Sequence, residues 1–494
     1  MSELQAPNLF SAARALSPLI IAAMSLLLIP IARLERFGHR ADAPIRAGRM
    51  AAALLLAGSG AALAAGSSYA STLNAGVLTI DPSEPGRLLV ALGGPVFALI
   101  VTVGRGRRAG TMGQVALFGL ALIDLALALP IGLAPIAILL VGSASLSALA
   151  AGDKEDAQRA RAVFRDLRTV GVLLTVTVVA ELLRSAIPLS ATDPSYATTS
   201  SLVAGVALTL SLVLLGAVGA FPFHHRLVRI FESLPIVGSL MVGVWIPAAL
   251  SLIIFNELSQ LAASVSEPIG GAVVPILFLT GTVTLMFAGV SALLHDDVGE
   301  VIGFLAVGNA GWLALGAATI IWHPSSLGPL LVAVPGALVI SLYGLWRISI
   351  RRRYELTSLQ ELSGWARHTE AIGIVLFFAT LAQITVPARE FLSGRFDIAG
   401  QDGSLVIVAA VVAGEVLLIA ASIRLLLVGM AQRSRSVRRT DVDERVKPIT
   451  VWIIAGVLLI SGVSAGFINI EAAASGLLQQ GPPPSAIPSP SATP

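Results

Sequence analysis

The chain has 494 residues and a formal net charge of +3, and 55% of its residues are hydrophobic whereas only 12% are charged. Soluble domains carry about twice that share of charged residues, and the apolar stretches here leave no segment that could form one. The sequence holds no cysteine, which excludes disulfides, thiolate-held iron–sulfur clusters and a cysteine nucleophile. The basic residues stand in short runs between apolar stretches, so a nucleic-acid-binding surface is not expected either.

Apolar stretches long enough to cross a membrane recur along almost the whole chain. A spanning helix needs about 20 mostly apolar residues, because a rise of 1.5 Å per residue must cover a hydrocarbon core of roughly 30 Å. By this criterion the sequence predicts an all-α polytopic membrane protein with about fourteen transmembrane helices. The predicted spans are 12–33, 47–69, 87–104, 111–129, 130–150, 168–188, 199–221, 235–256, 271–294, 299–321, 328–348, 370–388, 404–428 and 449–469.

The charges of the loops predict an orientation. Most loops after odd-numbered spans are rich in arginine, whereas most of the others are poor in cations; the loops around His295 and Arg395 break the pattern. Because arginine-rich loops are biased toward the cytoplasm, both termini should lie outside, which requires an even number of spans. We expect a multi-pass protein of a bacterial-type inner (cytoplasmic) membrane, with a disordered external tail over residues 470–494.

Ionisable side chains within spans are candidates for function, because inserting one costs about 2.5–3.5 kcal/mol. Asp124 lies in the fourth predicted span, Glu181 near the end of the sixth, and Glu415 in the middle of the thirteenth. Glu415 should be protonated, paired with a cation on another helix, or exposed to water, either as a proton relay or as half of a structural pair. Arg184 and Arg424 lie near span ends and are expected to extend to the membrane surface.

Two predicted spans are interrupted by proline, at Pro222 and at Pro387. Proline removes a backbone donor and opens a helix, although in membrane helices it often causes only a kink. Two breaks that lie five spans apart suggest inverted repeats of five helices each, as in secondary transporters. His224 and His225 follow the first break; adjacent residues point about 100° apart on a helix and make a poor metal pair, so we expect them at the cytoplasmic membrane surface beside Arg226.

Four colinear stretches resemble the antiporter-like, proton-translocating membrane subunits of respiratory complex I. Relatives of these subunits occur in membrane-bound hydrogenases and multisubunit cation/proton antiporters, and the chain is similar in helix number to the fourteen-helix N-type subunit of complex I. The stretches are Phe221–His224 with Leu234–Val237, Leu294–Leu315, Leu359–Trp365 with Ile384–Phe396, and Ser422–Leu425.

The resemblance implies a division of the chain into five parts. They are three N-terminal helices (1–110), a first antiporter-like repeat of helices four to eight (111–256), a second repeat of helices nine to thirteen (271–428), a final helix (449–469) and the external tail (470–494).

In that family a central axis of buried charges conducts protons: a glutamate in helix five, a lysine in helix seven, a lysine or histidine in helix eight, and a lysine or glutamate in helix twelve. Here residues 131–146 hold no acid, and Ala217 and Trp245 stand at or near the two lysine positions. The helix-twelve cation survives as Arg395, but arginine does not readily release a proton. The first half-channel is therefore expected to be inactive. The candidates for a proton path are Arg395, Glu415, His295, Asp297, His224, Glu181 and Asp124.

The resemblance implies a proton-translocating subunit of a complex I-type assembly, related to NADH:quinone oxidoreductase or to hydrogenases, which either conducts protons or has become partly structural. A stand-alone secondary cation/proton antiporter is the alternative. We expect no catalytic chemistry, no bound cofactor and no metal in this chain, so that redox reactions take place on partners. Those partners should be other membrane subunits and the lipid bilayer.

Overall fold

The computed structural model describes residues 17–30, 73–75, 78–80, 84–103, 109–129, 132–151, 157–187, 196–263, 270–322, 328–354, 358–362, 364–368, 370–392 and 405–431. This part of the chain is almost entirely helical. The elements are α2 (Ser17–Leu27), β1 (Leu73–Ala75), β2 (Leu78–Ile80), α5 (Glu84–Val103), α6 (Ala109–Ala128), α7 (Leu133–Ala151), α8 (Ala157–Ser185), α9 (Tyr196–Val218), α10 (His224–Ser233), α11 (Ile236–Leu240), η2 (Met241–Trp245), α12 (Ile246–Ala263), α13 (Gly270–Leu294), α14 (Val298–Trp322), α15 (Gly328–Tyr354), η3 (Trp365–His368), α16 (Glu370–Leu392) and α17 (Leu405–Met430).

The predicted spans coincide with helices wherever the structure describes them. Eight described helical segments are long and apolar enough to cross a membrane, which supports a multi-pass membrane protein. The largest difference is at α8, which begins at Ala157 rather than near residue 168, because its arginine-rich end continues the helix. The short β1–β2 hairpin is a minor exception to the all-α prediction. The described residues do not include the predicted spans 47–69 and 449–469 or the predicted tail 470–494.

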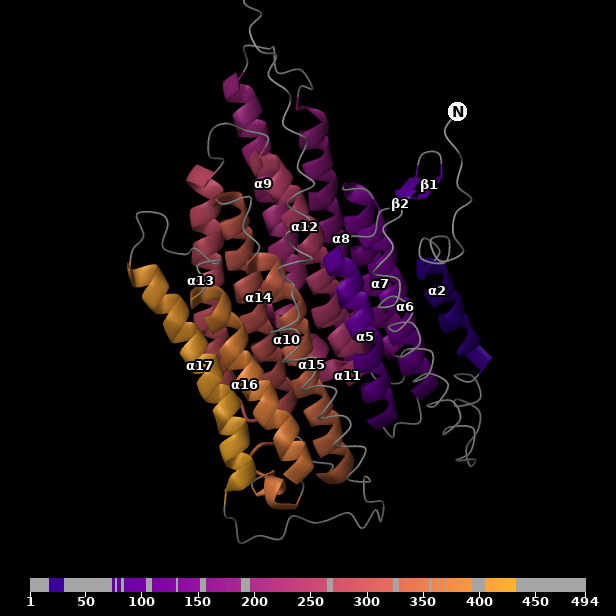
Figure 1. Cartoon of the computed structure of the whole chain (residues 1–494), viewed down its shortest axis with the longest axis vertical. Coiled ribbons are helices and arrows are strands. Elements are labelled where there is room, and N and C mark those ends of the chain that lie inside the picture. Colours follow the sequence, from indigo (N-terminus) through magenta and orange to yellow (C-terminus); the bar gives the residue numbers. More distant parts are fainter. Residues whose placement is uncertain are drawn as a thin grey trace, which may run out of the picture.

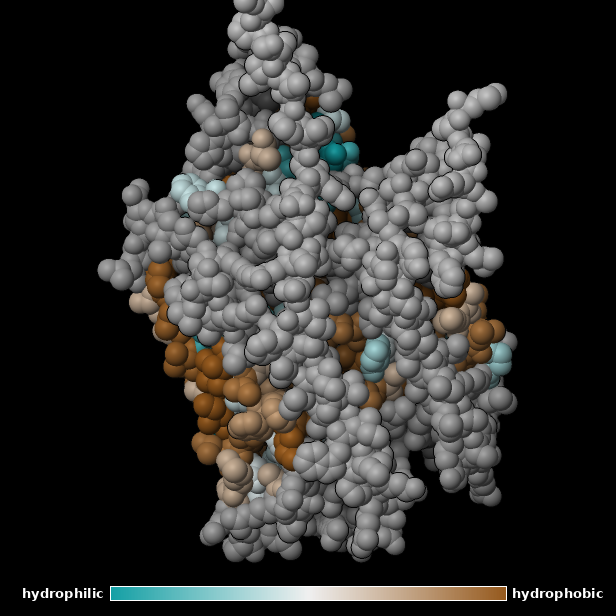
Figure 2. Space-filling view, in the orientation of Figure 1, coloured by the Kyte–Doolittle hydropathy of each residue, from teal (hydrophilic) through white to brown (hydrophobic). Residues whose placement is uncertain are grey.

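The helices lie side by side in an elongated bundle, with α2 at one edge and α17 at the other (Figure 1). The segment formed by α11, η2 and the first part of α12, up to Phe255, is buried, and α14 is almost completely buried. In contrast, α17 exposes Val406, Val412, Val416 and Leu427, and Figure 2 shows this apolar surface in brown. Apolar faces of this size suit lipid tails or neighbouring membrane helices rather than water.

Glycines allow α13 to approach α14 and α17 closely. A Cβ atom added at Gly281 or at Gly311 would lie 3.0 Å from the carbonyl oxygen of the other residue, so the α13 and α14 backbones meet at this point. Likewise, a Cβ atom at Gly289 on α13 would lie 2.9 Å from the carbonyl oxygen of Gly414 on α17. Small residues at such crossings let membrane helices gain van der Waals contact. They fix α17, which carries Glu415, against α13.

Substituting Gly311 by valine is expected to destabilise the bundle by about 1–3 kcal/mol, because the added methyl groups overpack the α13–α14 crossing. The Cβ atom alone would lie 2.9 Å from Leu285 Cγ. Thermal unfolding of the purified protein in detergent measures the effect. Gly373→Ala is the control, since its nearest contact would be an ordinary 3.7 Å. Equal melting temperatures for both variants would contradict the close crossing.

The helix break predicted at Pro222 is confirmed. α9 ends at Val218, Gly219 adopts a positive φ of 74°, the Phe221–Pro222 peptide bond is cis, and α10 begins at His224. The amide of Phe221 donates a hydrogen bond of 3.0 Å to Thr284 Oγ1 on α13. This side chain satisfies a donor that the broken helix cannot use, as a backbone in a membrane requires.

The helix break predicted at Pro387 is not found, because α16 continues through this residue to Leu392. A proline inside a helix removes one donor and can bend the helix without ending it. The prediction that the helix ends at Pro387 is therefore wrong.

A π-helical segment interrupts the buried segment that follows α10. Residues Met241–Trp245 form η2 between α11 and α12, with every side chain of η2 buried. Such π-bulges shift the faces of the flanking helices relative to each other and are common at functional sites. In this chain, η2 places Trp245 in the middle of the bundle.

Candidate functional site

Glu415 lies on α17 and is buried, with 9% of its surface exposed. One carboxyl oxygen accepts a hydrogen bond of 2.8 Å from Trp312 Nε1 on α14, and the other accepts a bond of 3.3 Å from Gln383 Nε2 on α16. Among the described residues no cation forms an ion pair with this carboxyl group. Among the described residues Glu415 is thus neither paired with a cation nor exposed to water; neutral donors from two other helices hold its carboxyl group.

A second set of polar side chains joins α15, α16 and α17. The hydroxyl of Tyr343 on α15 donates to Ser422 Oγ on α17 at 2.8 Å, and Thr380 on α16 also forms a hydrogen bond with this hydroxyl. Ser422 follows Glu415 by seven residues, or two helical turns, so both point from one face of α17. Thr380 and Gln383 share a face of α16 in the same way. Polar side chains thus line a seam between α15, α16 and α17.

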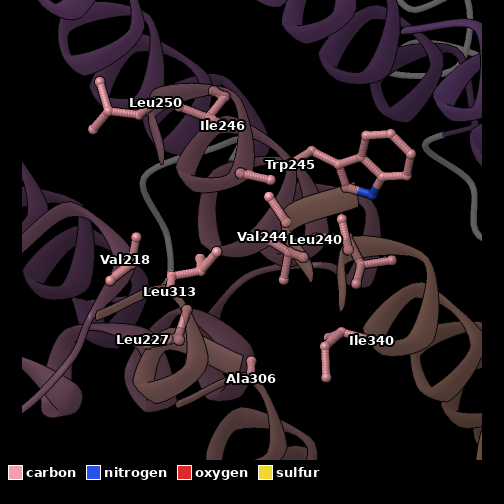
Figure 3. Close-up of a cluster of buried hydrophobic side chains, with 14 of the residues drawn as sticks. Val218, Leu227, Leu240, Val244, Trp245, Ile246, Leu250, Ala306, Leu313 and Ile340 are labelled. Carbon is pink, nitrogen blue, oxygen red and sulfur yellow. The ribbon is translucent and has the colours of Figure 1, made fainter. Parts of the chain in front are cut away.

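The centre of the bundle between α10, α12, α14 and α15 is apolar. Figure 3 shows Leu240, Val244, Trp245, Leu313 and other buried apolar side chains that fill it. The indole of Trp245, close to where the resemblance implies a lysine, donates to Ser341 Oγ at 2.9 Å. Burying an unpaired lysine among such side chains would be costly. Close packing of apolar side chains therefore occupies the place where the resemblance implies a lysine.

Within residues 111–256, where the resemblance implies a charged axis, the structure contains a buried ion pair between Asp166 and Arg226. Arg226 Nε donates to Asp166 Oδ1 at 2.6 Å, and Ser147 Oγ donates to the other carboxyl oxygen of Asp166 at 2.6 Å. Arg226 also donates to the carbonyl of Ala217, at the end of α9, at 2.7 Å. The ion pair and its hydrogen bonds thus join α7, α8, α9 and α10. The charges of Asp166 and Arg226 compensate each other.

His295 and Asp297 lie at the turn between α13 and α14. Asp297 caps α14, because its Oδ1 atom accepts hydrogen bonds from the backbone amides of Gly299 (2.7 Å) and Glu300 (3.2 Å). His295 Nδ1 lies 2.7 Å from the carbonyl of Ser291, and its Nε2 lies 3.9 Å from Glu300. His295 and Asp297 therefore both take part in contacts within this turn. No described hydrogen bond joins either of them to Glu415.

Arg424 reaches the turn that follows α13, where it is held by partners that the sequence did not indicate. Its guanidinium donates to the carbonyls of Leu293 and His295 at 2.7 and 2.8 Å and forms a short ion pair with Asp296. Hydrogen bonds from Gln360 and from Arg424 hold the pKa of Asp296, in the turn, below its ordinary value. The turn thus connects α13, α17 and the segment after α15.

Arg184 likewise has a partner that the sequence analysis missed. Arg184 Nη1 lies 3.2 Å from Glu257 on α12, whose side chain is only 5% exposed. Glu257 follows the predicted span 235–256, but α12 extends to Ala263 and carries it inside the bundle. Glu181, one turn before Arg184, is half-buried, and Asp124 is buried in α6.

His224 lies inside the bundle, which corrects its expected place at the membrane surface. It is 5% exposed and packs against Phe287 on α13, with ring centroids 4.3 Å apart, whereas His225 is exposed. No described residue forms a hydrogen bond with His224 Nδ1. Phe287 and Phe304 separate His224 from His295, so the rings form a packed row rather than a proton path. Burial of the first residue of α10 follows from the amphipathic face of this helix, which the break at Pro222 turns inward.

The structure thus singles out Glu415 among the predicted site residues and adds its partners Trp312 and Gln383. Arg395 lies outside the described residues, and its role stays a prediction. Side chains within 385–390, including that of Pro387, are not described either. The sequence could indicate Glu415 because it is an isolated acid in an apolar span. Its partners come from residues 103 and 32 positions away, and such contacts leave no local pattern.

Comparison with known proteins agrees with this fold. The family model described as NADH:quinone oxidoreductase/Mrp antiporter, transmembrane, matches residues 172–427, just over half of the chain. NADH-quinone oxidoreductase subunit N 1 of Opitutus terrae is 28% identical over 221 residues, which are 44% of this chain and 41% of that protein. The match therefore spans less than half of the relative's length.

Three solved structures of low sequence identity share the fold over nearly their whole chains. A chain of the membrane-bound sulfane sulfur reductase, an archaeal respiratory membrane complex, has a TM-score of 0.73 at 16% identity, with 94% of this chain and 96% of that one covered. A chain of the Mrp complex from Dietzia sp. has a TM-score of 0.69 at 12% identity (94% and 98% covered). A chain of respiratory complex I from Thermus thermophilus has a TM-score of 0.67 at 16% identity (92% and 98% covered). With the family match over residues 172–427, the chain belongs to the NADH:quinone oxidoreductase/Mrp antiporter transmembrane family.

Proposed function

We propose that this chain is an antiporter-like membrane subunit of a complex I-type assembly, and that its second half carries protons through Glu415. In this proposal the first half is structural. The redox reaction takes place on partner subunits, and this chain binds no cofactor. The two parts, 111–256 and 271–428, are the inverted repeats, the membrane is a bacterial-type inner membrane, and both termini lie outside.

The observation that carries the proposal is the environment of Glu415. Its carboxyl group is buried, its described partners are the neutral side chains Trp312 and Gln383, and the nearby hydroxyls of Tyr343 and Ser422 extend the polar seam. A carboxyl group without a fixed counter-ion can take up or release a proton without breaking an ion pair. Ionisable groups within membrane spans commonly mark ion paths.

The structural role of the first half rests on two observations. The centre of the bundle is filled by apolar side chains such as Trp245, and the Asp166–Arg226 pair is locked by short hydrogen bonds. Arginine keeps its proton at any physiological pH, so this pair can stabilise the helices but cannot relay protons readily.

Purification of the native protein from its own membranes through an affinity tag tests the assignment to an assembly. Other membrane subunits and a redox-active subunit are expected to co-purify in fixed proportion, because the apolar faces of the chain suit neighbouring helices. Recovery of the chain alone, in a form that exchanges Na⁺ or K⁺ for protons in vesicles, would instead establish a stand-alone antiporter.

Replacing Tyr343 by phenylalanine is expected to slow proton uptake roughly tenfold, since its phenol group bonds Ser422 on the helix of Glu415 and phenylalanine cannot donate or accept a proton. Proton uptake by vesicles that contain the assembly measures the effect. Ser341→Ala is the matched control: it removes a buried hydroxyl from the same helix, but one that contacts Trp245. Equal uptake rates in both variants would exclude Tyr343 from the path.

A further inference from the structure

The described side chains of α8, from Arg161 onward, include an exposed line that follows the helix to Leu182. Its members at one end are Arg161, Arg165 and Arg168, and further along the helix come Val172, Val179 and Leu182. Intervals of three, four and seven residues place these six side chains in one line at 3.6 residues per turn. We call this set the α8 stripe.

The opposite face of α8 is buried and contains the only acidic side chain among the described residues of this arginine-rich end. Val170, Leu173 and Ala180 pack inside the bundle, and Asp166 is 4% exposed. Because Asp166 pairs with Arg226, it does not neutralise the stripe. None of the described residues forms an ion pair with the three arginines of the stripe.

Two neighbouring residues shape the junction between the charged and apolar parts of the stripe. Phe164 is 70% exposed beside the arginines, as an aromatic ring at a membrane interface would be. Gly171 stands between Arg168 and Val172, and a Cβ atom added there would meet nothing within 4 Å. The helix surface beside the stripe is therefore open where its charged part ends.

We infer that the α8 stripe binds an anionic phospholipid, with the guanidinium groups on the phosphate and the valine–leucine part along an acyl chain. Arginine binds phosphate oxygens through paired, charge-assisted hydrogen bonds. From Val172 to Leu182 the helix rises about 15 Å. That length is half of a hydrocarbon core of roughly 30 Å, which is the depth of one leaflet.

The apolar part of the stripe distinguishes a lipid from a free phosphate. A soluble phosphate compound would use only the three arginines, whereas Val172, Val179 and Leu182 continue the same line into the membrane. Each arginine near an anionic headgroup should strengthen binding roughly fivefold, so that all three contribute on the order of a hundredfold. The inference does not depend on proton transport.

Native mass spectrometry of the full chain in neutral detergent tests the site, with phosphatidylglycerol and phosphatidylcholine as probes. The wild-type protein is expected to retain phosphatidylglycerol preferentially. The variant Arg161→Gln/Arg165→Gln/Arg168→Gln should lose this preference by on the order of a hundredfold, and Arg165→Gln alone by roughly fivefold. Arg351→Gln, at an exposed arginine of α15, is the matched control and should bind phosphatidylglycerol like the wild type.

Four results would overturn the inference. The first is equal binding of both lipids by the wild-type protein. The second is unchanged phosphatidylglycerol binding in the triple variant or in Arg165→Gln. The third is soluble glycerol phosphate that binds as tightly as the lipid, which would assign the arginines to a phosphate compound. The fourth is a partner subunit that dissociates from the native assembly of the triple variant while lipid binding stays the same, which would assign the arginines to a protein interface.

Discussion

Vesicles that contain the assembly with Glu415→Gln are expected to take up fewer protons per pair of electrons, and the proton flux through this chain should fall on the order of a hundredfold. Glutamine has the shape of glutamate and keeps a carbonyl oxygen that can accept the hydrogen bond from Trp312 Nε1, so the α14–α17 contact should persist. It cannot carry a proton. A pH-sensitive dye outside the vesicles, read together with the rate of electron transfer, measures both quantities.

Glu361→Gln is the control for this experiment, because Glu361 is exposed in the segment after α15 and its substitution changes the same charge without touching the seam. The stoichiometry of this variant should equal that of the wild type. If Glu415→Gln also kept the wild-type stoichiometry, Glu415 would have only a structural role.

Asp166→Ala should lower the free energy of unfolding by about 3–5 kcal/mol, the usual effect of removing one partner of a buried ion pair. The side chains of Arg226 and Asp166 are only 9% and 4% exposed, so the remaining guanidinium would be buried without its counter-ion. Ser147 would lose its acceptor as well. Thermal unfolding in detergent measures the loss of stability.

Two further variants show whether the loss of stability comes from the ion pair. The double variant Asp166→Leu/Arg226→Leu should recover part of the stability, because no charge then remains buried. Arg351→Ala, at an exposed residue, should change stability by less than about 1 kcal/mol. A melting temperature for Asp166→Ala equal to that of Arg351→Ala would mean that the ion pair does not hold the first half together.

Hydropathy predicted the helices of this fold well, because the requirement for about 20 apolar residues leaves few alternatives. The prolines predicted the breaks in these helices less well. Pro222 does break its helix, where Gly219 adopts a positive φ, but Pro387 stands inside α16. The two prolines differ in their surroundings rather than in their own chemistry, and those surroundings cannot be read along the chain.

The candidate site could be predicted only in part. An isolated acid within an apolar span indicated Glu415, whereas Asp166 was overlooked because the arginine-rich end of α8 was assigned to a loop. Its pairing with Arg226 depends on four helices that meet in space. The same limit explains why the ion-pair partners of Arg184 and Arg424, which are Glu257 and Asp296, were not predicted.

Infrared difference spectroscopy of the assembly, oxidised minus reduced, tests most directly whether Glu415 changes its protonation as the proposed function requires. The account predicts a carboxyl C=O band that shifts in deuterated water and disappears in Glu415→Gln, while Glu361→Gln retains it. A difference spectrum in which no carboxyl band depends on Glu415, in an assembly that still pumps protons, would contradict the account.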